Sequence, residues 1–178
     1  SKIASDSVSL SYHNSFGLPV TVARPFNTFG PRQSARAIIP TIIAQLTVGV
    51  EEIKVGDLRP TRDFNFVLDT CSGLTSLINN EKAIGRTINI GSGTEISIQE
   101  LITEVQKICG TSARIISDNA RIRPEKSEVF RLVCDNSLIK EITGFSHTFD
   151  LHQGLNATIE WFKNENNLSK FKPEQYNV

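Results

Sequence analysis

The chain has 178 residues, of which 39% are hydrophobic and 21% are charged, and its 19 basic residues balance its 19 acidic ones. This balance excludes the strongly basic class of proteins that binds nucleic acid or membranes through a net field. Hydrophobic runs stay below the ~20 residues that a membrane span needs, and the first residues lack the pattern of a secretion signal. We therefore expect a cytoplasmic protein that binds neither nucleic acid nor membrane.

The cysteines and histidines give no indication of a metal site. The chain has three of each, and their spacing matches no common ligand set: Cys71, Cys109, Cys134, His13, His147 and His152. Each cysteine has apolar neighbours, so we expect buried, reduced thiols. Because the chain contains no Met, we expect either a processed N-terminus or a piece of a longer protein.

The first third of the chain predicts a helix, a strand and a second helix. Apolar residues at helical spacing predict a helix over 1–16, which Gly17 ends in a left-handed conformation. The run 18–23 predicts a short buried strand with a Pro near its start, where Pro is tolerated. A polar loop follows, and an apolar helix is expected over 37–48, ended by Gly49.

The middle of the chain predicts further short strands. Two of them, 53–56 and 63–67, flank a polar turn. Asp69 is expected to cap a helix that runs to about residue 79. The segment 87–90 predicts a strand that ends in a Gly-Ser-Gly turn.

The last third continues the alternation of strands and helices. The predicted elements are a helix over 97–108 opened by a capping box, a strand over 114–117, a short helix over 136–143 capped by Asn136, and an amphipathic helix over 151–163. The tail from residue 164 is polar, and we expect it to be poorly ordered. The alternation favours the α/β class.

The loop after the first predicted strand carries residues suited to ligand binding. It reads Arg24-Pro25-Phe26-Asn27-Thr28-Phe29-Gly30-Pro31-Arg32-Gln33, and in open α/β sheets ligands bind beyond the carboxyl ends of the strands. Asn27 either bonds its own backbone as a turn residue or directs its amide at a ligand. Arg32 and Arg36 are either solvated charges or a cationic pair that binds an anion near a helix N-terminus.

Several sequence blocks, taken in order, resemble the extended short-chain dehydrogenase/reductases, the family of NAD-dependent nucleotide-sugar epimerases and dehydratases. The blocks are Ser1-Lys2-Ile3-Ala4-Ser5-Asp6, the loop from Arg24 to Pro31, Arg62-Asp63-Phe64-Asn65-Phe66-Val67-Leu68-Asp69, Thr87-Ile88-Asn89-Ile90-Gly91 and Arg123-Pro124. The resemblance is closest to UDP-N-acetylhexosamine 4,6-dehydratases. It implies the carboxyl-terminal part of a Rossmann-type fold, with the last core helix and strand followed by a smaller α/β substrate-binding lobe.

The resemblance also implies roles for individual residues. Lys2 matches the Lys of the family's Tyr-x-x-x-Lys motif, a catalytic and cofactor-binding role, although a lone lysine near a terminus is ordinarily solvated. Phe26 matches a position beside the cofactor, and Asp63 and Asp69 match structural positions that fix a turn and cap a helix. Arg62 is implied to grip a diphosphate with its planar fork. The residues implied to contact the nucleotide-sugar are Asn27, Arg32, Arg36, Arg62, Asn89, Arg123 and Glu128. For the segment around Arg123, a solvated loop of mixed charge is the open alternative.

The resemblance divides the chain into a Rossmann remnant at 1–35, a nucleotide-sugar-binding lobe at 36–165 and a polar tail at 166–178. The family's glycine-rich dinucleotide loop and its catalytic Tyr do not occur in this sequence. NAD therefore belongs to the parent family, and we expect none to be bound by this chain alone.

We expect this chain to be the UDP-sugar-binding portion of an NAD-dependent nucleotide-sugar 4,6-dehydratase or epimerase, not catalytic in isolation. The alternative is a free-standing, truncated and non-catalytic protein of the same descent, with weak UDP-sugar binding or none. A half-enzyme would expose strand edges and apolar surface, so we expect a homo-oligomer that covers them.

Overall fold

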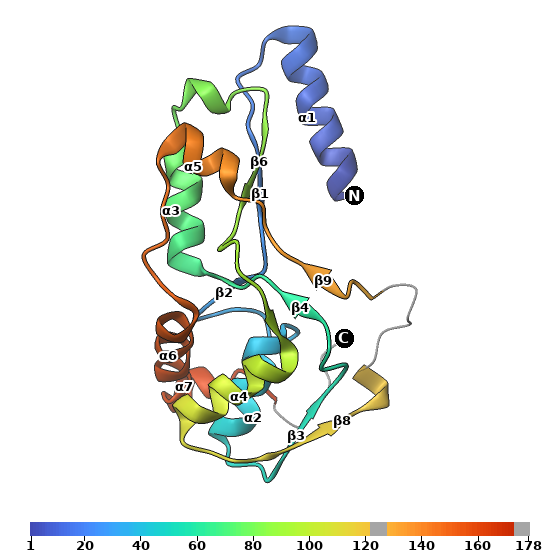
Figure 1. The fold of residues 1–178 in the computed structure, drawn as a ribbon, viewed down its shortest axis with the longest axis vertical. Helices are drawn as coiled ribbons and strands as arrows, with labels where there is room; N and C mark the ends of the chain where they lie inside the picture. Colours follow the sequence, from blue (N-terminus) through green and yellow to red (C-terminus); the bar gives the residue numbers. More distant parts are fainter. Residues whose placement is uncertain (122–127, 173–178) are drawn as a thin grey trace.

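The computed structural model describes residues 1–121 and 128–172 and confirms the predicted α/β class. Figure 1 shows an elongated arrangement with both ends of the long axis built from helices and strands. The α-helices are α1 (Lys2–Phe16), α2 (Ile38–Thr47), α3 (Val67–Leu77), α4 (Ile98–Cys109), α5 (Ser137–Thr143), α6 (Leu151–Phe162) and α7 (Glu165–Leu168), with 3-10 turns at Glu81–Ala83 and Asn119–Arg121.

The strands are short, and most of their pairings are parallel. They are β1 (Val22–Pro25), β2 (Thr28–Phe29), β3 (Glu52–Val55), β4 (Thr61–Arg62), β5 (Asn65–Phe66), β6 (Thr87–Ile90), β7 (Ile96–Ser97), β8 (Arg114–Ser117) and β9 (Arg131–Leu132). Parallel pairs join β1 to β6, β2 to β5, β3 to β8 and β4 to β9, whereas β4 and β7 are antiparallel. Parallel strands need long crossovers, which the intervening helices supply.

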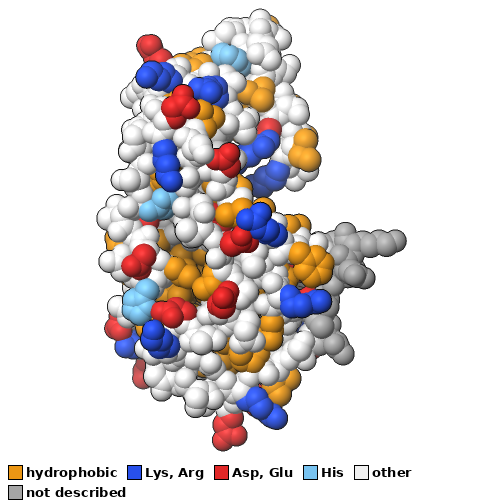
Figure 2. Space-filling model, in the orientation of Figure 1, with side chains coloured by type: hydrophobic (Ala, Val, Ile, Leu, Met, Phe, Trp, Pro, Cys, Tyr) orange, Lys and Arg blue, Asp and Glu red, His pale blue; other side chains and the backbone are white. Residues whose placement is uncertain are grey.

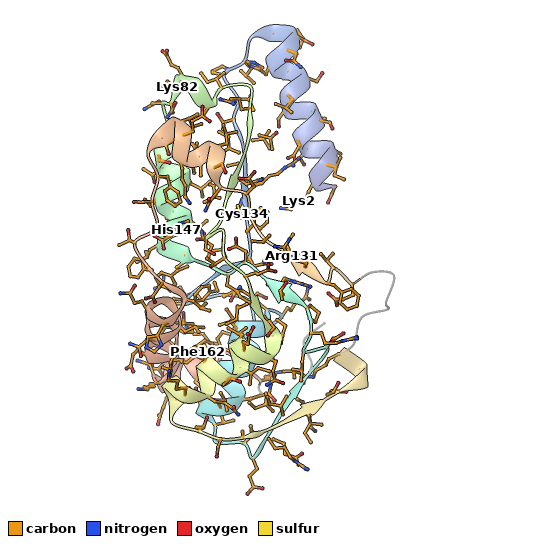
Figure 3. The ribbon with its side chains drawn as sticks, in the orientation of Figure 1. Lys2, Lys82, Arg131, Cys134, His147 and Phe162 are labelled. Carbon is orange, nitrogen blue, oxygen red and sulfur yellow. The ribbon has the colours of Figure 1, made fainter. Side chains whose placement is uncertain are left out.

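Each end of the molecule has its own hydrophobic cluster. The smaller one lies where α3 and α5 pack beside β6, and it contains Leu77, Ala83, Ile88, Ile90, Ile139, Ile142 and Phe145. The larger one lies among α2, α4 and α6 and contains Phe29, Ile42, Leu101, Leu155 and Phe162. Figure 1 shows this second group of helices at the lower end of the view, with Phe162 labelled among them in Figure 3.

Helix α1 lies at the side of the molecule and buries none of its residues. Its predicted end is confirmed, because Gly17 adopts a φ of 67° and its N–H bonds the carbonyl of His13. An ion pair ties it to β1, with Arg24 donating to Asp6 Oδ2 from Nε at 2.9 Å and from Nη2 at 2.6 Å. Hydrophobic side chains of α1 remain on the surface, some of them visible in the space-filling view of Figure 2.

Some predicted boundaries are corrected. The first strand begins at Val22 and not at residue 18, since the Val22 N–H donates to Arg86 and starts the pairing with β6. The predicted strand 63–67 is shortened to β5, and a further short strand, β4, lies in the polar turn predicted before it, so that Asp63 and Phe64 separate the two. The chain leaves the strand conformation there because Asp63 turns inward to bind other loops.

One predicted helix cap is wrong, and another is confirmed in position but not in its side-chain contact. Asp69 lies inside the first turn of α3, and its carboxylate instead accepts N–H bonds from Thr148 and Phe149 at 2.8 and 3.1 Å. Asn136 is the N-cap residue of α5, as predicted, but its side chain makes no cap hydrogen bond, and its amide donates to Gly91 O at 2.8 Å. Both side chains bind segments distant in sequence, which a local cap pattern does not reveal.

The capping box at Ser97 and Glu100 is confirmed, and a second one, Asp150 with Gln153, opens α6. The expectation of a poorly ordered tail is wrong for residues 165–172. Helix α7 lies there, and Phe171 packs against Phe162 with ring centroids 4.6 Å apart. The division at residues 35 and 165 remains a prediction.

Asp63 is a buried polar side chain that connects three segments of the described fold. It is fully buried, and its Oδ1 accepts hydrogen bonds from Ser92 N at 2.9 Å and Ser92 Oγ at 2.7 Å. Its Oδ2 accepts from Gly93 N at 2.9 Å and from Cys134 N at 3.0 Å. One carboxylate therefore joins the β4–β5 turn, the loop after β6 and the segment after β9, which confirms its predicted structural role.

We expect Asp63→Asn to lower the free energy of unfolding by about 3 kcal/mol, because an amide NH2 then faces backbone donors that need an acceptor. Urea denaturation followed by circular dichroism measures the change. Asp6→Asn is the matched control, with an expected loss below about 1 kcal/mol for its surface ion pair. Equal losses in the two variants would contradict this role of Asp63.

Candidate functional site

One pocket gathers four of the residues predicted to contact a nucleotide-sugar: Asn27, Arg36, Arg62 and Glu128. It has a volume of about 350 Å³ and lies between α2, the end of β3 and the start of β4. The polar residues that also line it are Gln33, Thr41, Asp57 and Arg121, and the apolar ones include Ile38, Ile39, Val55, Phe64 and Ile98. Residues from three separate sequence blocks thus meet at one place.

Asn27 is positioned by the strand β5 that runs beside it. Its Nδ2 donates to the carbonyl of Asp63 at 2.9 Å, and its own carbonyl accepts from Asn65 N at 3.1 Å. The side chain therefore bonds backbone that is distant in sequence, not the local turn backbone. This contact holds the amide at the pocket while leaving its oxygen for other donors.

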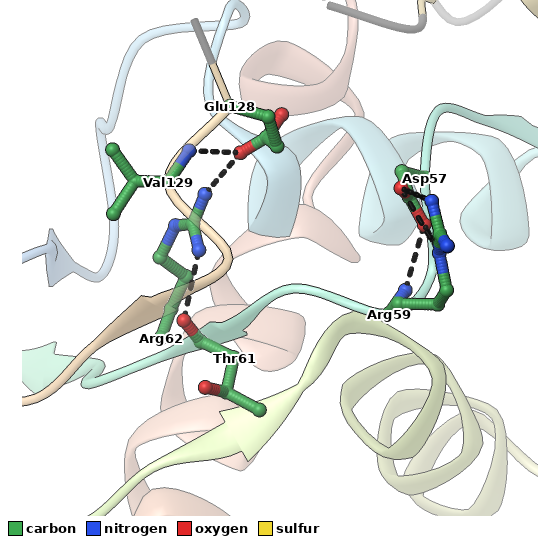
Figure 4. Close-up of polar contacts among 6 residues, drawn as sticks. All are labelled: Asp57, Arg59, Thr61, Arg62, Glu128 and Val129. Carbon is green, nitrogen blue, oxygen red and sulfur yellow. Dashed lines mark hydrogen bonds and ion pairs between the residues drawn. The ribbon is translucent and has the colours of Figure 1, made fainter. Parts of the chain in front are cut away.

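Arg62 and Glu128 form an ion pair on the pocket wall, drawn in Figure 4. Arg62 Nη2 donates to Glu128 Oε1 at 2.6 Å, and Nη1 donates to the carbonyl of Thr61 at 2.8 Å. Only 14% of the Arg62 side chain and 10% of the Glu128 side chain are exposed. At this depth the attraction is screened less than in a surface pair, so the two groups hold each other in place.

Asp57 adds a second carboxylate to the pocket. The side chain and the backbone N–H of Arg59 both donate to it, and they lower the pKa of Asp57 to about 2. Figure 4 draws this pair at the opposite side of the view from Arg62 and Glu128. The guanidinium of Arg59 also lies 5.4 Å from the ring centre of Phe130. Asp57 is therefore charged at neutral pH and held by its neighbour.

The described lining of the pocket carries a small excess of positive charge. Three guanidinium groups (Arg36, Arg62, Arg121) outnumber two carboxylates (Asp57, Glu128), which gives 3 − 2 = +1. Arg121 is held by Asp118 at 3.2 Å and is 8% exposed, whereas Arg36 is exposed. The arrangement suits a ligand with an anionic group near the cations and hydrogen-bonding groups near the carboxylates.

Other predicted site residues lie outside this pocket. Lys2 is exposed in the first turn of α1, labelled in Figure 3. Phe26 follows the end of β1, where its N–H donates to Ile90 O at 2.8 Å. Asn89 lies on β6, and its amide donates to Asp135 O at 3.4 Å. These three residues belong to the upper part of the fold around β1 and β6.

The remaining two predicted residues, Arg32 and Arg123, are close in sequence to residues that line the pocket. Arg32 is exposed and has a φ of 68°, an uncommon backbone conformation for a residue other than glycine. It is not part of the pocket lining. Arg123 lies outside the described residues.

Sequence reasoning missed some members of the pocket. Gln33 immediately follows the Gly-Pro-Arg turn, and Arg121 comes two residues before Arg123, so both lie within segments that were already singled out. Asp57 belongs to a polar turn with no distinguishing pattern. Gln33, Asp57 and Arg121 meet Arg62 in one pocket because of how segments distant in sequence pack together. No local sequence pattern predicts this packing.

The cysteines lie away from the pocket lining. Burial and the nearby Asp63 carboxylate raise the pKa of Cys134 to about 12, so its thiol is protonated and unreactive at neutral pH. Cys71 is exposed, which corrects its prediction as a buried thiol. Among the described residues no cluster of His, Cys, Asp or Glu could hold a metal ion. A search of the same residues finds no helix with the length and hydropathy to cross a membrane.

Comparisons with known proteins show which family this chain and its fold resemble. A model of the family described as GDP-mannose 4,6 dehydratase matches residues 1–158. A dTDP-glucose 4,6-dehydratase of Actinoplanes sp. is 32% identical over 163 residues, which is 92% of this chain and 50% of that protein. The chain spans about half the length of the curated relatives it matches.

Two solved structures have closely similar backbones. RMD from Pseudomonas aeruginosa, complexed with NADPH, has a TM-score of 0.82 and 29% identity, and the match covers 90% of this chain and 54% of that one. The UDP-glucuronic acid 4-epimerase from Bacillus cereus, in complex with UDP-glucuronic acid and NAD, has a TM-score of 0.81 and 27% identity. That match covers 90% of this chain and 50% of the epimerase. These similarities confirm the predicted likeness to the carboxyl-terminal half of the extended short-chain dehydrogenase/reductases.

A double-mutant cycle tests whether Arg62 and Glu128 depend on each other. We expect Arg62→Met and Glu128→Gln each to lower the free energy of unfolding, and the double variant to lose less than their sum by about 1–2 kcal/mol. Each single change leaves one partly buried group without its partner. The exposed pair Arg114 and Glu52 is the control, with an expected coupling below about 0.5 kcal/mol. If the coupling energy between Arg62 and Glu128 were no larger than that between Arg114 and Glu52, the result would contradict a preorganised pair.

Proposed function

Since the chain belongs to the GDP-mannose 4,6-dehydratase family, we propose that its pocket is the nucleotide-sugar-binding portion of an NAD-dependent 4,6-dehydratase or epimerase. The observation that carries the proposal is the meeting of Asn27, Arg36, Arg62 and Glu128 in one cavity. These residues come from separate blocks of the sequence. A chance surface cavity would not be expected to collect the side chains that the family resemblance selects.

The chemistry of the pocket fits the parts of a UDP-sugar. Arg36 and Arg62 provide planar guanidinium groups for a diphosphate, which they bind better than lysines would. Glu128 and Asp57 can accept hydrogen bonds from hydroxyl groups. The apolar part of the lining, with Ile39, Val55 and Phe64, offers a surface for a flat base. Within the family, a UDP-N-acetylhexosamine is our first candidate for the ligand.

The residues of this chain do not fit a complete NAD site. The Gly-Ser-Gly turn at residues 91–93 uses the N–H groups of Ser92 and Gly93 to bind the Asp63 carboxylate. Those donors are therefore already occupied and do not cradle a pyrophosphate. Lys2 and Phe26 match positions beside the cofactor in the family. They are the two residues of this chain that the resemblance assigns to the cofactor site. We propose that the isolated chain binds a UDP-sugar without holding NAD or catalysing hydride transfer.

A second candidate is a free-standing, non-catalytic protein that works as a homo-oligomer. Helix α1 favours it, because Ile3, Val8, Tyr12 and Phe16 are 80%, 57%, 54% and 76% exposed. Tyr12 and Phe16 lie against each other on the surface, with ring centroids 5.4 Å apart and the rings tilted by 50°. Val8, Tyr12 and Phe16 are spaced four residues apart and so form an apolar stripe on one face of the helix. Such a stripe is costly to leave in water and suits a contact with another chain.

We expect UDP-N-acetylglucosamine at millimolar concentration to raise the melting temperature of the chain, since a ligand that binds only the folded state stabilises it. Arg62→Ala should abolish the shift, and Arg36→Ala should weaken binding about tenfold through the loss of a charge-assisted contact. Differential scanning fluorimetry and calorimetric titration measure both effects.

The control for these arginine variants is Arg114→Ala, an exposed arginine outside the pocket lining. Its binding should match that of the unchanged chain. No thermal shift for the unchanged chain at millimolar ligand would sink the proposed binding function. Equal weakening by Arg36→Ala and Arg114→Ala would remove the pocket as the site of binding.

We expect the chain to sediment as a dimer or larger oligomer in analytical ultracentrifugation. The double variant Val8→Glu/Phe16→Glu should shift it towards monomer, because charges on the stripe oppose its burial. Lys82→Glu, at an exposed position on the 3-10 turn Glu81–Ala83, is the control and should keep the oligomer. A monomer at every concentration tested would argue against the oligomer.

A further inference from the structure

A series of hydrogen bonds between side chains joins the segment after α5 to the loop after β1. His147 bonds Asn65, with Nε2 and Oδ1 3.0 Å apart. Asn65 Nδ2 donates to Thr70 Oγ1 at 2.8 Å, and the hydroxyl oxygens of Thr70 and Thr28 lie 3.0 Å apart. Thr28 Oγ1 donates to the carbonyl of Phe26 at 3.0 Å. The side chains of His147, Asn65, Thr70 and Thr28 thus form one polar network, whose middle members Asn65 and Thr70 are only 1% and 6% exposed.

The carbonyl at one end fixes the direction of every bond in the polar network. A carbonyl oxygen only accepts, so the hydroxyl proton of Thr28 is committed to Phe26 O. Thr28 Oγ1 then accepts from the Thr70 hydroxyl, and Thr70 Oγ1 accepts from the amide nitrogen of Asn65. This leaves Asn65 Oδ1 facing His147, so Nε2 of the imidazole carries a proton and donates it to the bond. The polar network therefore requires a donor at position 147.

The backbone beside His147 is anchored so that the ring meets this requirement. The next two residues donate their N–H groups to the carboxylate of Asp69, Thr148 at 2.8 Å and Phe149 at 3.1 Å. Since Asp69 belongs to α3, this segment is tied to the helix that also carries Thr70. Figure 3 labels His147 near the middle of the long axis of the molecule. The imidazole is thus held from its own side of the polar network.

The charge state of His147 also suits a single donated bond. Burial lowers the pKa of His147, and the carboxylates of Asp69 and Asp63 oppose this effect, whereas Lys140 adds to it. The ring is therefore neutral at pH 7 and carries one N–H group. The bond to Asn65 assigns that group to Nε2.

The other end of the polar network holds both sequence neighbours of Asn27. Thr28 follows Asn27 and bonds the carbonyl of Phe26, which precedes it. Asn65 also acts through its backbone, because its N–H donates to Asn27 O at 3.1 Å beside the pairing of β2 with β5. The amide of Asn27 lies at the pocket, where it donates to the carbonyl of Asp63 at 2.9 Å. A displacement of Asn65 or Thr28 therefore moves a residue of the pocket.

We infer that His147 is a positioning residue, which donates from Nε2 to Asn65 and completes the polar network that holds the loop carrying Asn27. The inference rests on the proposed function, because it assigns how a residue of the proposed ligand site is held. His147 is not part of that pocket lining and acts through Asn65, Thr70 and Thr28. Without its donor, Asn65 Oδ1 would be a buried acceptor without this partner, and an amide that turned to find another would release Thr70.

The first test compares two substitutions of His147. His147→Phe keeps a ring and removes both nitrogens, whereas His147→Gln keeps an N–H group that can donate to Asn65. We expect the dissociation constant for UDP-N-acetylglucosamine to rise about tenfold in His147→Phe, as for the loss of one hydrogen bond in a buried network. In His147→Gln it should stay within about twofold of the unchanged chain. Calorimetric titration measures both constants, and His152→Gln, at an exposed histidine paired with Glu104, is the control that should not change binding.

The second test reaches the same loop from the far end of the polar network. Thr28→Val keeps the shape of the side chain and removes its hydroxyl, so it should also weaken binding. The double variant Thr28→Val/His147→Phe should weaken binding by less than the product of the two single effects, because both changes break the same series of bonds. Independent, fully multiplicative effects would overturn the inference. If His147→Phe does not fold, unchanged binding in Thr28→Val overturns it.

NMR of the imidazole nitrogens tests the direction of the bonds without any substitution. We expect the neutral ring of His147 to carry its proton on Nε2, and a proton on Nδ1 instead would overturn the inference. If His147→Phe leaves binding unchanged, or if His147→Phe and His147→Gln weaken it equally, the inference is overturned while the proposed function stands. If the unchanged chain does not bind UDP-N-acetylglucosamine, both the inference and the proposed function fall.

Discussion

The buried carboxylate of Asp63 is the constraint on which the two ends of this fold depend. Four N–H and O–H donors from the loops after β6 and β9 converge on it. A buried charge of this kind is tolerated only when its hydrogen bonds are nearly complete. Its backbone carbonyl also accepts from the Asn27 amide, and the next residue towards the N-terminus is Arg62. The residue that joins these loops therefore also holds the side chain of Asn27 at the pocket and is the direct sequence neighbour of Arg62.

The pocket is organised by pairs of charges and not by isolated cations. Arg62 is held by Glu128 and by the carbonyl of Thr61, while Thr61 and Arg131 both donate to Glu95 on the neighbouring side of β4. A ligand phosphate that approaches Arg62 meets a guanidinium whose geometry is already fixed, so little side-chain entropy is lost on binding. Arg36 is exposed and offers a second cation from the start of α2, where the helix N-terminus favours negative charge.

Local patterns predicted the elements better than they predicted the partners of polar side chains. The end of α1 at Gly17 and the capping box of α4 depend on residues within one turn of each other, and both were found in the sequence. Asp69 is not the cap that was predicted, and the side chain of Asn136, although at the predicted N-cap position, bonds elsewhere, because their partners lie 79 and 45 residues away. Family blocks located Arg62 and Glu128, which are 66 residues apart. Gln33 lay inside a recognised block, but its place in the pocket lining depends on the bond from its amide to Thr28 O and on packing in three dimensions, which no local pattern defines.

In the family, nucleotide-sugar binding and hydride transfer depend on different sets of residues. The described pocket is lined by residues of this half alone, and its main ion pair is complete within it. By contrast, the residues matching the cofactor side of the family, Lys2 and Phe26, lie around α1 and β1, outside the pocket lining. The pocket has its own support in Asp63 and in the β4 pairings, which do not involve these two residues. On the proposed function, the half-length chain keeps the element that recognises the substrate and separates it from the chemistry.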